Sequence, residues 1–192
     1  SFVKTNDLDA FNVTIPYKKA VIPYLDEISS EAASIGAINL VIKKGGKLYG
    51  HNTDYFGFEY MIDSAKIDVK GKKAIVLGMG GAAVTICTVL KDKGIGQIIS
   101  VDKDDNTKEF LSLHADTNII INATPVGMYP RCDEAPALPY HLLTSKHYLF
   151  DLVYNPERTL FMERGQAQGA HTLSGLAMLY AQAESAWKIW NE

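Results

Sequence analysis

Two adjacent lysines stand where the sequence predicts the start of a helix. Lys18 and Lys19 follow Pro16, which ends an alternating apolar strand predicted over residues 11–15. A helix N-terminus and a neighbouring positive charge both disfavour a charged ammonium group, and this favours proton transfer by such a lysine. The alternative is that both lysines are ordinary solvated surface charges. Lys18 is therefore a candidate proton donor and acceptor that needs a partner.

Asp54 is one candidate for that partner. Asn52 or Thr53 can cap a helix that runs to about Asp63, and the first turn of this helix stabilises a carboxylate. A carboxylate held there could orient an ammonium group across a cleft. Asp54 could equally serve the helix cap alone, and spacing does not bring it to Lys18.

A glycine-rich turn between a predicted strand and a predicted helix indicates a dinucleotide site. The stretch GMGGAA fits the pattern G-x-G-x-x-[GA], and its candidate cofactor-binding residues are Gly78, Gly80, Gly81 and Ala82. Glycines let the backbone approach a pyrophosphate, and the helix N-terminus stabilises its negative charge. The alternative is a glycine turn that binds no ligand.

Two charged residues at the end of the next predicted strand bear on the choice of cofactor. Asp102 lies where an acid usually binds the ribose 2′-hydroxyl of NAD. Lys103 beside it favours the 2′-phosphate of NADP. Spacing alone leaves NAD and NADP open, and both residues could instead be solvated loop charges.

Composition narrows the classes of partner. The chain has 192 residues, 47% of them hydrophobic, with 19 Lys and Arg against 22 Asp and Glu. A net charge of -3 gives no basic field to attract nucleic acid or an anionic membrane, so we expect a small-molecule substrate. The cysteines and histidines share no ligand spacing, which predicts no metal site and reduced thiols. No apolar run reaches membrane-spanning length and no export signal is evident, so a cytoplasmic location is expected.

The first third of the chain predicts a small α/β domain. A helical stretch broken near Pro23 is predicted from Pro16 to Ser34. A hairpin of strands over residues 37–44 and 47–52 follows. A polar, glycine-punctuated stretch then predicts a boundary near Val69.

The rest of the chain predicts a doubly wound, Rossmann-like domain. The glycine turn joins a buried strand to an apolar helix and a second strand over residues 96–102, and further strands are predicted over 118–123 and 147–154. Too few residues separate the second strand from the third for the helix and strand that this fold usually inserts. We therefore expect a trimmed sheet or a missing segment around residues 105–117. A closing helix is predicted to pack through one apolar stripe: Leu176, Leu179, Tyr180, Ala183, Trp187 and Trp190.

Seven blocks of sequence, in this order, resemble the shikimate dehydrogenase family. They are FNVTIPYKK, GAIN, HNTDYFGF, GMGGAA, NATPVGM, DLVYNPERT and SGLAMLYAQA. The resemblance covers nearly the whole chain and implies two α/β domains. We expect a catalytic domain over residues 1–68, a dinucleotide-binding domain over 69–173, and a helix over 174–192 that returns to the first domain.

The resemblance implies reversible, NADP-linked reduction of 3-dehydroshikimate to shikimate. It places Lys18 and Asp54 at the positions of the family's catalytic lysine and aspartate. The implied substrate contacts are Thr14, Asn39, Tyr154 and Gln182, and the implied walls of the nicotinamide pocket are Asn122, Thr124, Met128 and Gly175. For these residues, ordinary structural roles are the alternative.

The chain also departs from the family pattern. The family begins with a segment in which two serines hold the substrate carboxylate, and we expect this chain to start after it. The family often has an Arg-containing turn where this chain reads VDKDD. This departure weakens the NADP assignment without reversing it, and Asp102 keeps NAD open. Rival hypotheses are a quinate or shikimate dehydrogenase that uses NAD, and a non-catalytic nucleotide-sensing module. The sequence leaves monomer or homodimer open.

Overall fold

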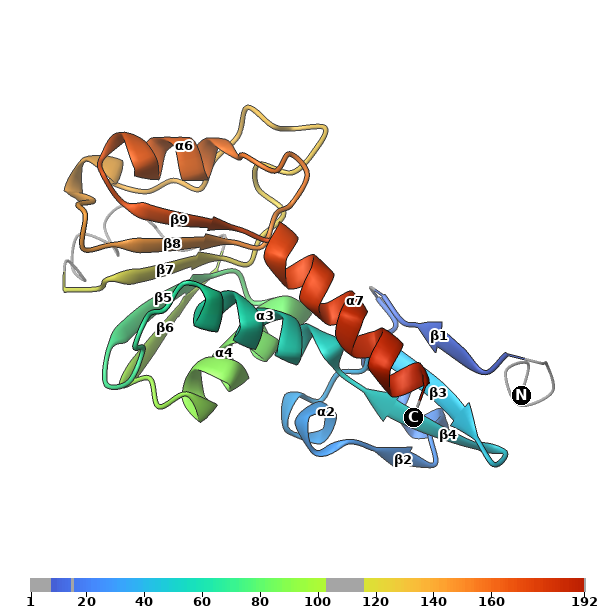
Figure 1. The fold of residues 1–192 in the computed structure, drawn as a ribbon. Helices are drawn as coiled ribbons and strands as arrows, with labels where there is room; N and C mark the ends of the chain where they lie inside the picture. The colour runs from blue at the N-terminus through green and yellow to red at the C-terminus, as the bar shows by residue number, and fades with distance from the viewer. Residues whose placement is uncertain (1–7, 15, 103–115, 192) are drawn as a thin grey trace.

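The computed structural model describes residues 8–14, 16–102 and 116–191, which form two β-sheets and the helices that pack on them (Figure 1). One sheet has four strands in the order β1-β3-β4-β2, and the other has five in the order β6-β5-β7-β8-β9. The mixed α/β architecture agrees with the predicted fold class. Lys103 and most of the stretch in which a strand and helix seemed to be missing lie outside the described residues.

The four-stranded sheet is built around the predicted hairpin. Strands β3 (Leu40–Lys44) and β4 (Lys47–His51) pair antiparallel, and the turn between them is made by Gly45 and Gly46, both with positive φ. Strand β1 (Ala10–Asn12) pairs antiparallel with β3, and the two-residue β2 (Glu27–Ile28) pairs parallel with β4. Helix α2 (Ser30–Ile35) ends at Gly36, whose φ of 70° is the left-handed conformation that closes many helices.

The predicted helix from Pro16 to Ser34 is wrong over most of its length. The chain instead makes successive turns, a short 3-10 helix η1 (Ile22–Tyr24) and strand β2 before α2 begins. Pro23 lacks the amide donor that a helix continuing from Pro16 would use at this position, which explains why no longer helix forms. Lys18 thus lies in a series of turns, and the expected helix dipole does not act on it.

The strand predicted over residues 11–15 is shorter than expected. Regular pairing with β3 ends at Asn12, after which the Val13 amide donates to the Asn39 carbonyl at 2.8 Å. Thr14 follows on exposed chain, and residue 15 lies outside the described residues.

Helix α3 (Thr53–Ser64) begins where the capping residues predict. The Asn52 side chain accepts a hydrogen bond from the Tyr55 amide, so Asn52 is the cap and Asp54 lies in the first turn. The side-chain NH2 group of Asn52 also donates to the Ala37 carbonyl at 2.9 Å, which ties this helix start to the chain that leads into β3.

The five-stranded sheet is parallel throughout. Its strands are β5 (Lys73–Leu77), β6 (Gln97–Val101), β7 (Ile119–Asn122), β8 (Tyr148–Asp151) and β9 (His171–Ser174). Helix α4 (Gly81–Asp92) connects β5 to β6, and α6 (Leu160–Ala167) precedes β9. A second short 3-10 helix, η2 (Tyr140–Leu142), lies before β8. The βαβ unit was predicted, whereas α6 and β9 were not.

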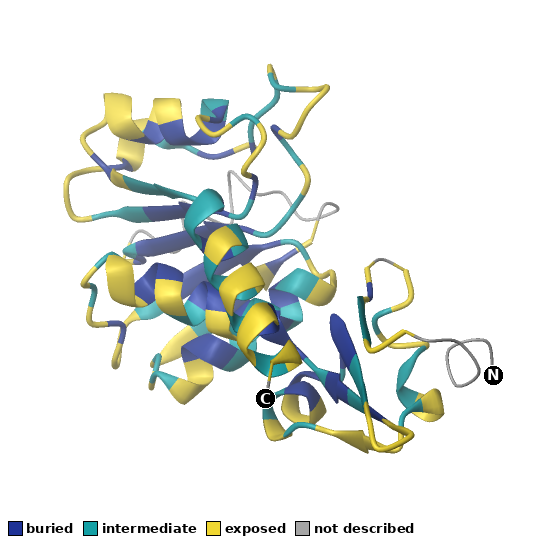
Figure 2. Ribbon diagram, turned by 45° about the vertical axis from the view of Figure 1, so that its right-hand side comes forward, coloured by how far each residue is buried: buried dark blue, intermediate teal, exposed yellow. Residues whose placement is uncertain are grey.

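Both faces of this sheet are buried, as a parallel sheet requires. Along β5, Ala74 and Val76 pack with α3, α4 and Met178 in one core, while Ile75 and Leu77 pack with α6 in a second. Figure 2 shows the buried strands between these helices. Among the described strands β6 is an edge of the sheet.

Helix α7 (Leu176–Trp190) runs along α3 and reaches the four-stranded sheet (Figure 1). The predicted apolar stripe is wrong for most of its members, because four of the six are exposed: Tyr180, Ala183, Trp187 and Trp190. The residues of α7 that are buried are Met178 and Ala186. The apolar pattern of the helix therefore did not identify which face of α7 is buried.

Gly57 is the residue of α3 that permits this close approach. A Cβ atom there would lie 2.7 Å from the Met178 carbonyl oxygen, which is backbone and cannot turn aside. We expect Gly57→Ala to lower the free energy of unfolding by about 1–3 kcal/mol, as overpacking does. Chemical denaturation measures this, with Glu59→Ala on the partly exposed face of the same helix as the control. Equal stability of the two variants would contradict the proposed close contact.

Candidate active site

The centre of the candidate site is an ion pair between Lys18 and Asp54. The Lys18 ammonium donates a hydrogen bond to Asp54 Oδ2 at 2.6 Å, and the two side chains are 23% and 18% exposed. The pair is thus shielded from bulk water yet still open to a small molecule. Partial burial strengthens the attraction between the two charges relative to a surface pair. Sequence spacing had not brought these residues together.

Two backbone arrangements hold this pair. The Lys18 carbonyl accepts a hydrogen bond from the Ile38 amide at 2.8 Å, which fixes the turn that carries the lysine against the chain leading into β3. Asp54 is fixed by its place in the first turn of α3, where the helix dipole stabilises a carboxylate.

Three polar side chains from separate elements meet beside Asp54. Asn39 Oδ1 accepts from the Thr53 amide at 2.7 Å, and Asn39 Nδ2 donates to Thr53 Oγ1 at 3.0 Å. The Thr53 hydroxyl contacts Gln182 Oε1 of α7 at 3.2 Å. Asn39 and Gln182 were predicted as substrate contacts, and the structure brings them together through Thr53. Thr53 itself was considered only as a possible helix cap.

Two other predicted substrate contacts lie on exposed chain. Thr14 is exposed, and its carbonyl accepts from the Tyr17 amide at 2.8 Å, so it belongs to the first of the turns that lead to Lys18. Tyr154 is 48% exposed and follows the carboxyl end of β8. The contacts of these side chains with a substrate stay a prediction.

The glycine turn after β5 has the form that a dinucleotide requires. Gly78 has φ of 103°, a conformation that favours glycine, and a Cβ there would lie 3.0 Å from the Thr124 methyl group. Cβ atoms built at Gly80 and Gly81 meet nothing within 4 Å, so open space lies before the N-terminus of α4. This helix has no side-chain cap, which leaves amides of its first turn, including that of Ala82, for an anion. These residues fit a pyrophosphate.

Asp102 stands beside this turn. The Gly78 amide donates to the carbonyl of Val101, the residue before Asp102, at 2.8 Å. Asp102 is exposed. It follows the second strand of the βαβ unit, the position from which an acid usually contacts the ribose of a dinucleotide. Lys103, the rival determinant, falls outside the described residues.

The predicted nicotinamide wall is organised by a buried acid that sequence reasoning missed. Asn122, at the end of β7, is fully buried and accepts from the Thr124 hydroxyl at 2.6 Å. Its amide group donates to Asp151 Oδ1 at 2.9 Å. Burial raises the pKa of the Asp151 carboxyl, and the hydrogen bonds from Thr159, Val153 and Asn122 oppose this rise. The signal that could have revealed Asp151 is a carboxylate that ends an otherwise apolar strand.

The other two residues of the predicted wall occupy contrasting positions. Met128 is 45% exposed, so it is not a core residue. Gly175 is buried, and a Cβ atom there would collide with the Leu152 carbonyl oxygen. Glycine is therefore required where β9 passes into α7.

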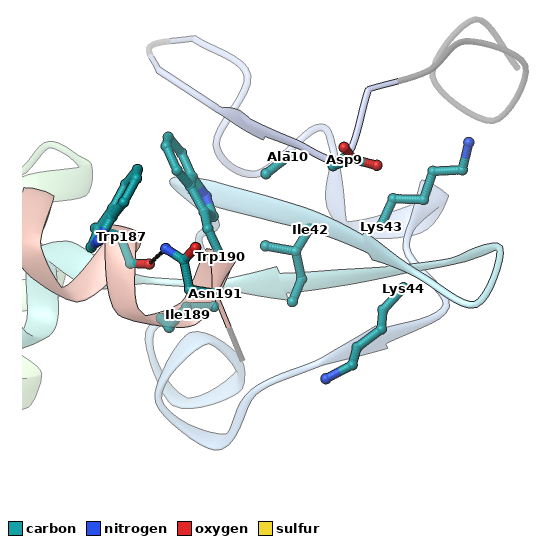
Figure 3. A pocket seen from close by; sticks show the side chains of 9 residues that line it. All are labelled: Asp9, Ala10, Ile42, Lys43, Lys44, Trp187, Ile189, Trp190 and Asn191. Carbon is teal, nitrogen blue, oxygen red and sulfur yellow. Dashed lines mark hydrogen bonds between the residues drawn. The ribbon is translucent and has the colours of Figure 1, made fainter.

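One hollow that the structure shows lies away from this site. It has a volume of about 600 Å³ and lies between β1, β3 and the end of α7, where its lining includes Asp9, Lys43, Trp187 and Trp190 (Figure 3). Its lining does not include Lys18, Asp54 or the glycine turn, so this hollow is not part of the candidate site.

The described residues contain neither a cluster of metal ligands nor a membrane-spanning helix. No group of three or more His, Cys, Asp or Glu side chains there could hold a metal ion. Over the same part of the chain, no helix combines the length and apolar character needed to cross a membrane.

Comparison with known proteins decides the family. The model of the shikimate dehydrogenase substrate binding domain matches residues 1–41. A shikimate dehydrogenase (NADP(+)) of Clostridium beijerinckii is 39% identical over 204 residues, covering 99% of this chain and 74% of that protein. The chain belongs to the shikimate dehydrogenase family.

Solved structures of this family agree in fold. A shikimate dehydrogenase crystallised in complex with NADP+ superposes with a TM-score of 0.88 at 33% identity, covering 98% of this chain and 73% of that one. A quinate dehydrogenase from Corynebacterium glutamicum in complex with NAD superposes with a TM-score of 0.84 at 27% identity, covering 96% of this chain and 73% of that one. The fold thus accommodates either cofactor.

Asp102 is the residue through which cofactor preference can be tested. An acid at the ribose hydrogen-bonds the 2′-hydroxyl of NAD and repels the 2′-phosphate of NADP. We expect Asp102→Ser to shift the ratio of kcat/KM values toward NADP by about tenfold, the equivalent of about 1.4 kcal/mol. Rates with each cofactor at saturating substrate measure this, and an unchanged ratio would show that Asp102 does not contact the ribose. Asp68→Ser, at an exposed turn far along the chain from Asp102, is the control.

Proposed function

We propose that this protein is a shikimate dehydrogenase, which reversibly reduces 3-dehydroshikimate to shikimate with NADPH. The observation that carries the proposal is the 2.6 Å ion pair of Lys18 and Asp54 beside the Asn39, Thr53 and Gln182 side chains. A proton-transferring amine beside hydroxyl-binding amides suits the interconversion of a ketone and an alcohol on a polyhydroxylated ring. The relatives that carry the name shikimate dehydrogenase support the same activity.

In the direction of reduction, the Lys18 ammonium donates its proton to the carbonyl oxygen as the carbon receives a hydride. NADPH, when bound, supplies that hydride from its nicotinamide ring. Asp54 accepts a hydrogen bond from Lys18, so it holds the ammonium in place and keeps a negative charge beside it. In the reverse direction, the neutral amine accepts the hydroxyl proton of shikimate.

The neighbouring amides orient the ring. Asn39 is buried and makes two hydrogen bonds with Thr53, so its position is fixed before a substrate arrives. Gln182 comes from α7 and closes the other side of Thr53. Pre-positioned hydrogen-bonding groups lower the entropic cost of aligning the reacting carbon with a hydride donor.

The cofactor binds, in this proposal, at the N-terminus of α4 and along the carboxyl ends of β5 and β7. Gly80, Gly81 and Ala82 would hold the pyrophosphate, and Thr124, Met128 and Gly175 would border the nicotinamide. In this division of labour, residues 1–68 carry the substrate groups and 69–173 the cofactor groups. The helix of residues 174–192 brings Gln182 back to the substrate side.

A second candidate function is an NAD-linked quinate or shikimate dehydrogenase. The exposed Asp102 at the end of β6 favours it, because an acid there suits the ribose of NAD. Initial rates with shikimate and with quinate, each with NADP+ and with NAD+, distinguish the candidates. We expect the highest kcat/KM with shikimate and NADP+. A higher value for quinate with NAD+ would favour the second candidate, and no turnover by folded protein in any combination would favour a nucleotide-sensing role.

A further inference from the structure

Asp151 is a buried carboxylate at the end of an otherwise apolar strand. It is 0% exposed at the carboxyl end of β8, whose preceding residues are the apolar Tyr148, Leu149 and Phe150. Burying a carboxylate is unfavourable unless hydrogen bonds compensate for the loss of water. An apolar side chain would have completed this strand at lower cost, so a purely structural account of Asp151 is weak.

The carboxylate of Asp151 joins three separate segments. Oδ1 accepts from Asn122 Nδ2 at 2.9 Å and from the Val153 amide at 3.0 Å, and Oδ2 accepts from the Thr159 hydroxyl at 2.5 Å. Asn122 ends β7, Val153 follows β8, and Thr159 caps α6 by accepting from the Met162 amide. One buried group thus links both loops that leave this edge of the sheet.

The loop after β7 takes its shape from Asn122. The oxygen of the Asn122 side chain accepts from the amide and the hydroxyl of Thr124, at 3.1 and 2.6 Å, and its nitrogen donates to the Val126 carbonyl at 3.2 Å. Asp151 orients the Asn122 amide, because a carboxylate can only accept and must face the NH2 group. The carboxylate therefore decides which way the Asn122 side chain is turned, and hence where Thr124 lies.

The loop after β8 is held by the same acid. Val153 precedes Tyr154, and its carbonyl accepts from the Gly175 amide at 3.3 Å. The two loops also contact each other, since the Tyr129 amide donates to the Asn155 carbonyl at 2.9 Å. These contacts adjoin Met128 and Gly175, which are proposed to border the nicotinamide, and Tyr154, a predicted substrate contact.

Resting on the function proposed above, we propose that Asp151 is a positioning residue that holds the loops of residues 123–128 and 152–159 in the arrangement hydride transfer needs. Because it is fully buried, it acts through Asn122, Val153 and Thr159 and does not touch the substrate. The pyrophosphate turn at Gly80 and Gly81 is outside this network. Loss of Asp151 should therefore impair turnover more than cofactor affinity.

Comparison of Asp151→Ala, Asp151→Asn and Leu149→Ala tests this proposal. Leu149 is fully buried on the same strand and contacts neither loop through hydrogen bonds, so its variant controls for lost stability. We expect Asp151→Ala to lower kcat by about 10²-fold, as small misplacements of reacting groups do, with Kd for NADP+ near that of the wild type. Asp151→Asn keeps one acceptor oxygen and should restore most of the turnover. Leu149→Ala should lower Tm while kcat is retained.

A loss of kcat in Asp151→Ala no greater than that in Leu149→Ala would overturn the proposal. If Asp151→Ala yields no folded protein, Thr159→Val decides: it removes the donor to Oδ2 and should lower kcat about tenfold, as loss of one hydrogen bond can. A wild-type kcat in that variant also overturns the proposal.

Hydrogen exchange separates this proposal from the proposed activity. Amides of residues 123–128 and 152–155 should exchange faster in Asp151→Ala than in Leu149→Ala, a readout that needs no substrate. Equal exchange in the two variants overturns the positioning role. Absence of shikimate turnover in the wild type refutes the activity alone, and the exchange comparison then still decides the role of Asp151.

Discussion

Replacing Lys18 by alanine is expected to lower kcat for shikimate oxidation by several orders of magnitude while the protein keeps its fold. A positioned acid or base contributes about 10²–10⁴-fold to such a rate, and Lys18 is the amine that the structure holds against Asp54. The fold should be kept, because the Asp54 carboxylate that remains is still stabilised by the first turn of α3. Steady-state rates and a thermal melt of the same sample measure the two effects.

Lys19→Ala is the matched control. Lys19 is the next residue along the same turn and is exposed, so its loss removes the same charge from nearly the same place. We expect a rate close to that of the wild type. Lys18→Arg should be as inactive as Lys18→Ala. A guanidinium group stays protonated, so it cannot accept the hydroxyl proton of shikimate. Near-normal turnover of Lys18→Ala would remove its catalytic role.

The elements that the sequence predicted well are those whose signals are local. The turn at Gly45 and Gly46 between two alternating strands, the cap at Asn52, and the glycine turn before α4 each lie within a few residues of the structure they determine. The helix expected after Pro16 failed because pairing of β2 with β4, a contact distant in sequence, competed with the local pattern.

The prediction of which face of α7 is buried was wrong for a related reason. The apolar pattern favoured Trp187 and Trp190 as buried residues, but α7 turns Met178 and Ala186 inward and approaches α3 closely over Gly57. Which face of a helix is buried depends on the surface it meets. The sequence of the helix alone does not contain that surface.

The candidate site could be predicted only in part. Lys18 and Asp54 are 36 residues apart, and their contact depends on the turn around Lys18 and on the chain leading into β3, so only family resemblance pointed to it. The part that Thr53 and Asp151 play in the site was missed, because their importance lies in the side chains that they join. Buried polar groups of this kind become visible when their hydrogen bonds are known.

Asp54→Asn is expected to lower kcat/KM by about 10²-fold or more, within the range that a positioned acid–base group contributes. Asparagine has nearly the shape of aspartate, so the first turn of α3 should form normally. It lacks the negative charge that holds the Lys18 ammonium at 2.6 Å, and its NH2 group could turn toward the ammonium. Steady-state rates with shikimate and NADP+ measure the effect.

Asp63→Asn, at the other end of α3, is the matched control because its carboxylate pairs with Lys93 at 2.7 Å on the surface. We expect its rate to equal that of the wild type. If Asp54 acts through Lys18, the double variant of Lys18→Ala with Asp54→Asn should be little slower than Lys18→Ala alone, since the two side chains then work as a unit. Fully additive losses would mean that Asp54 contacts the substrate independently of Lys18.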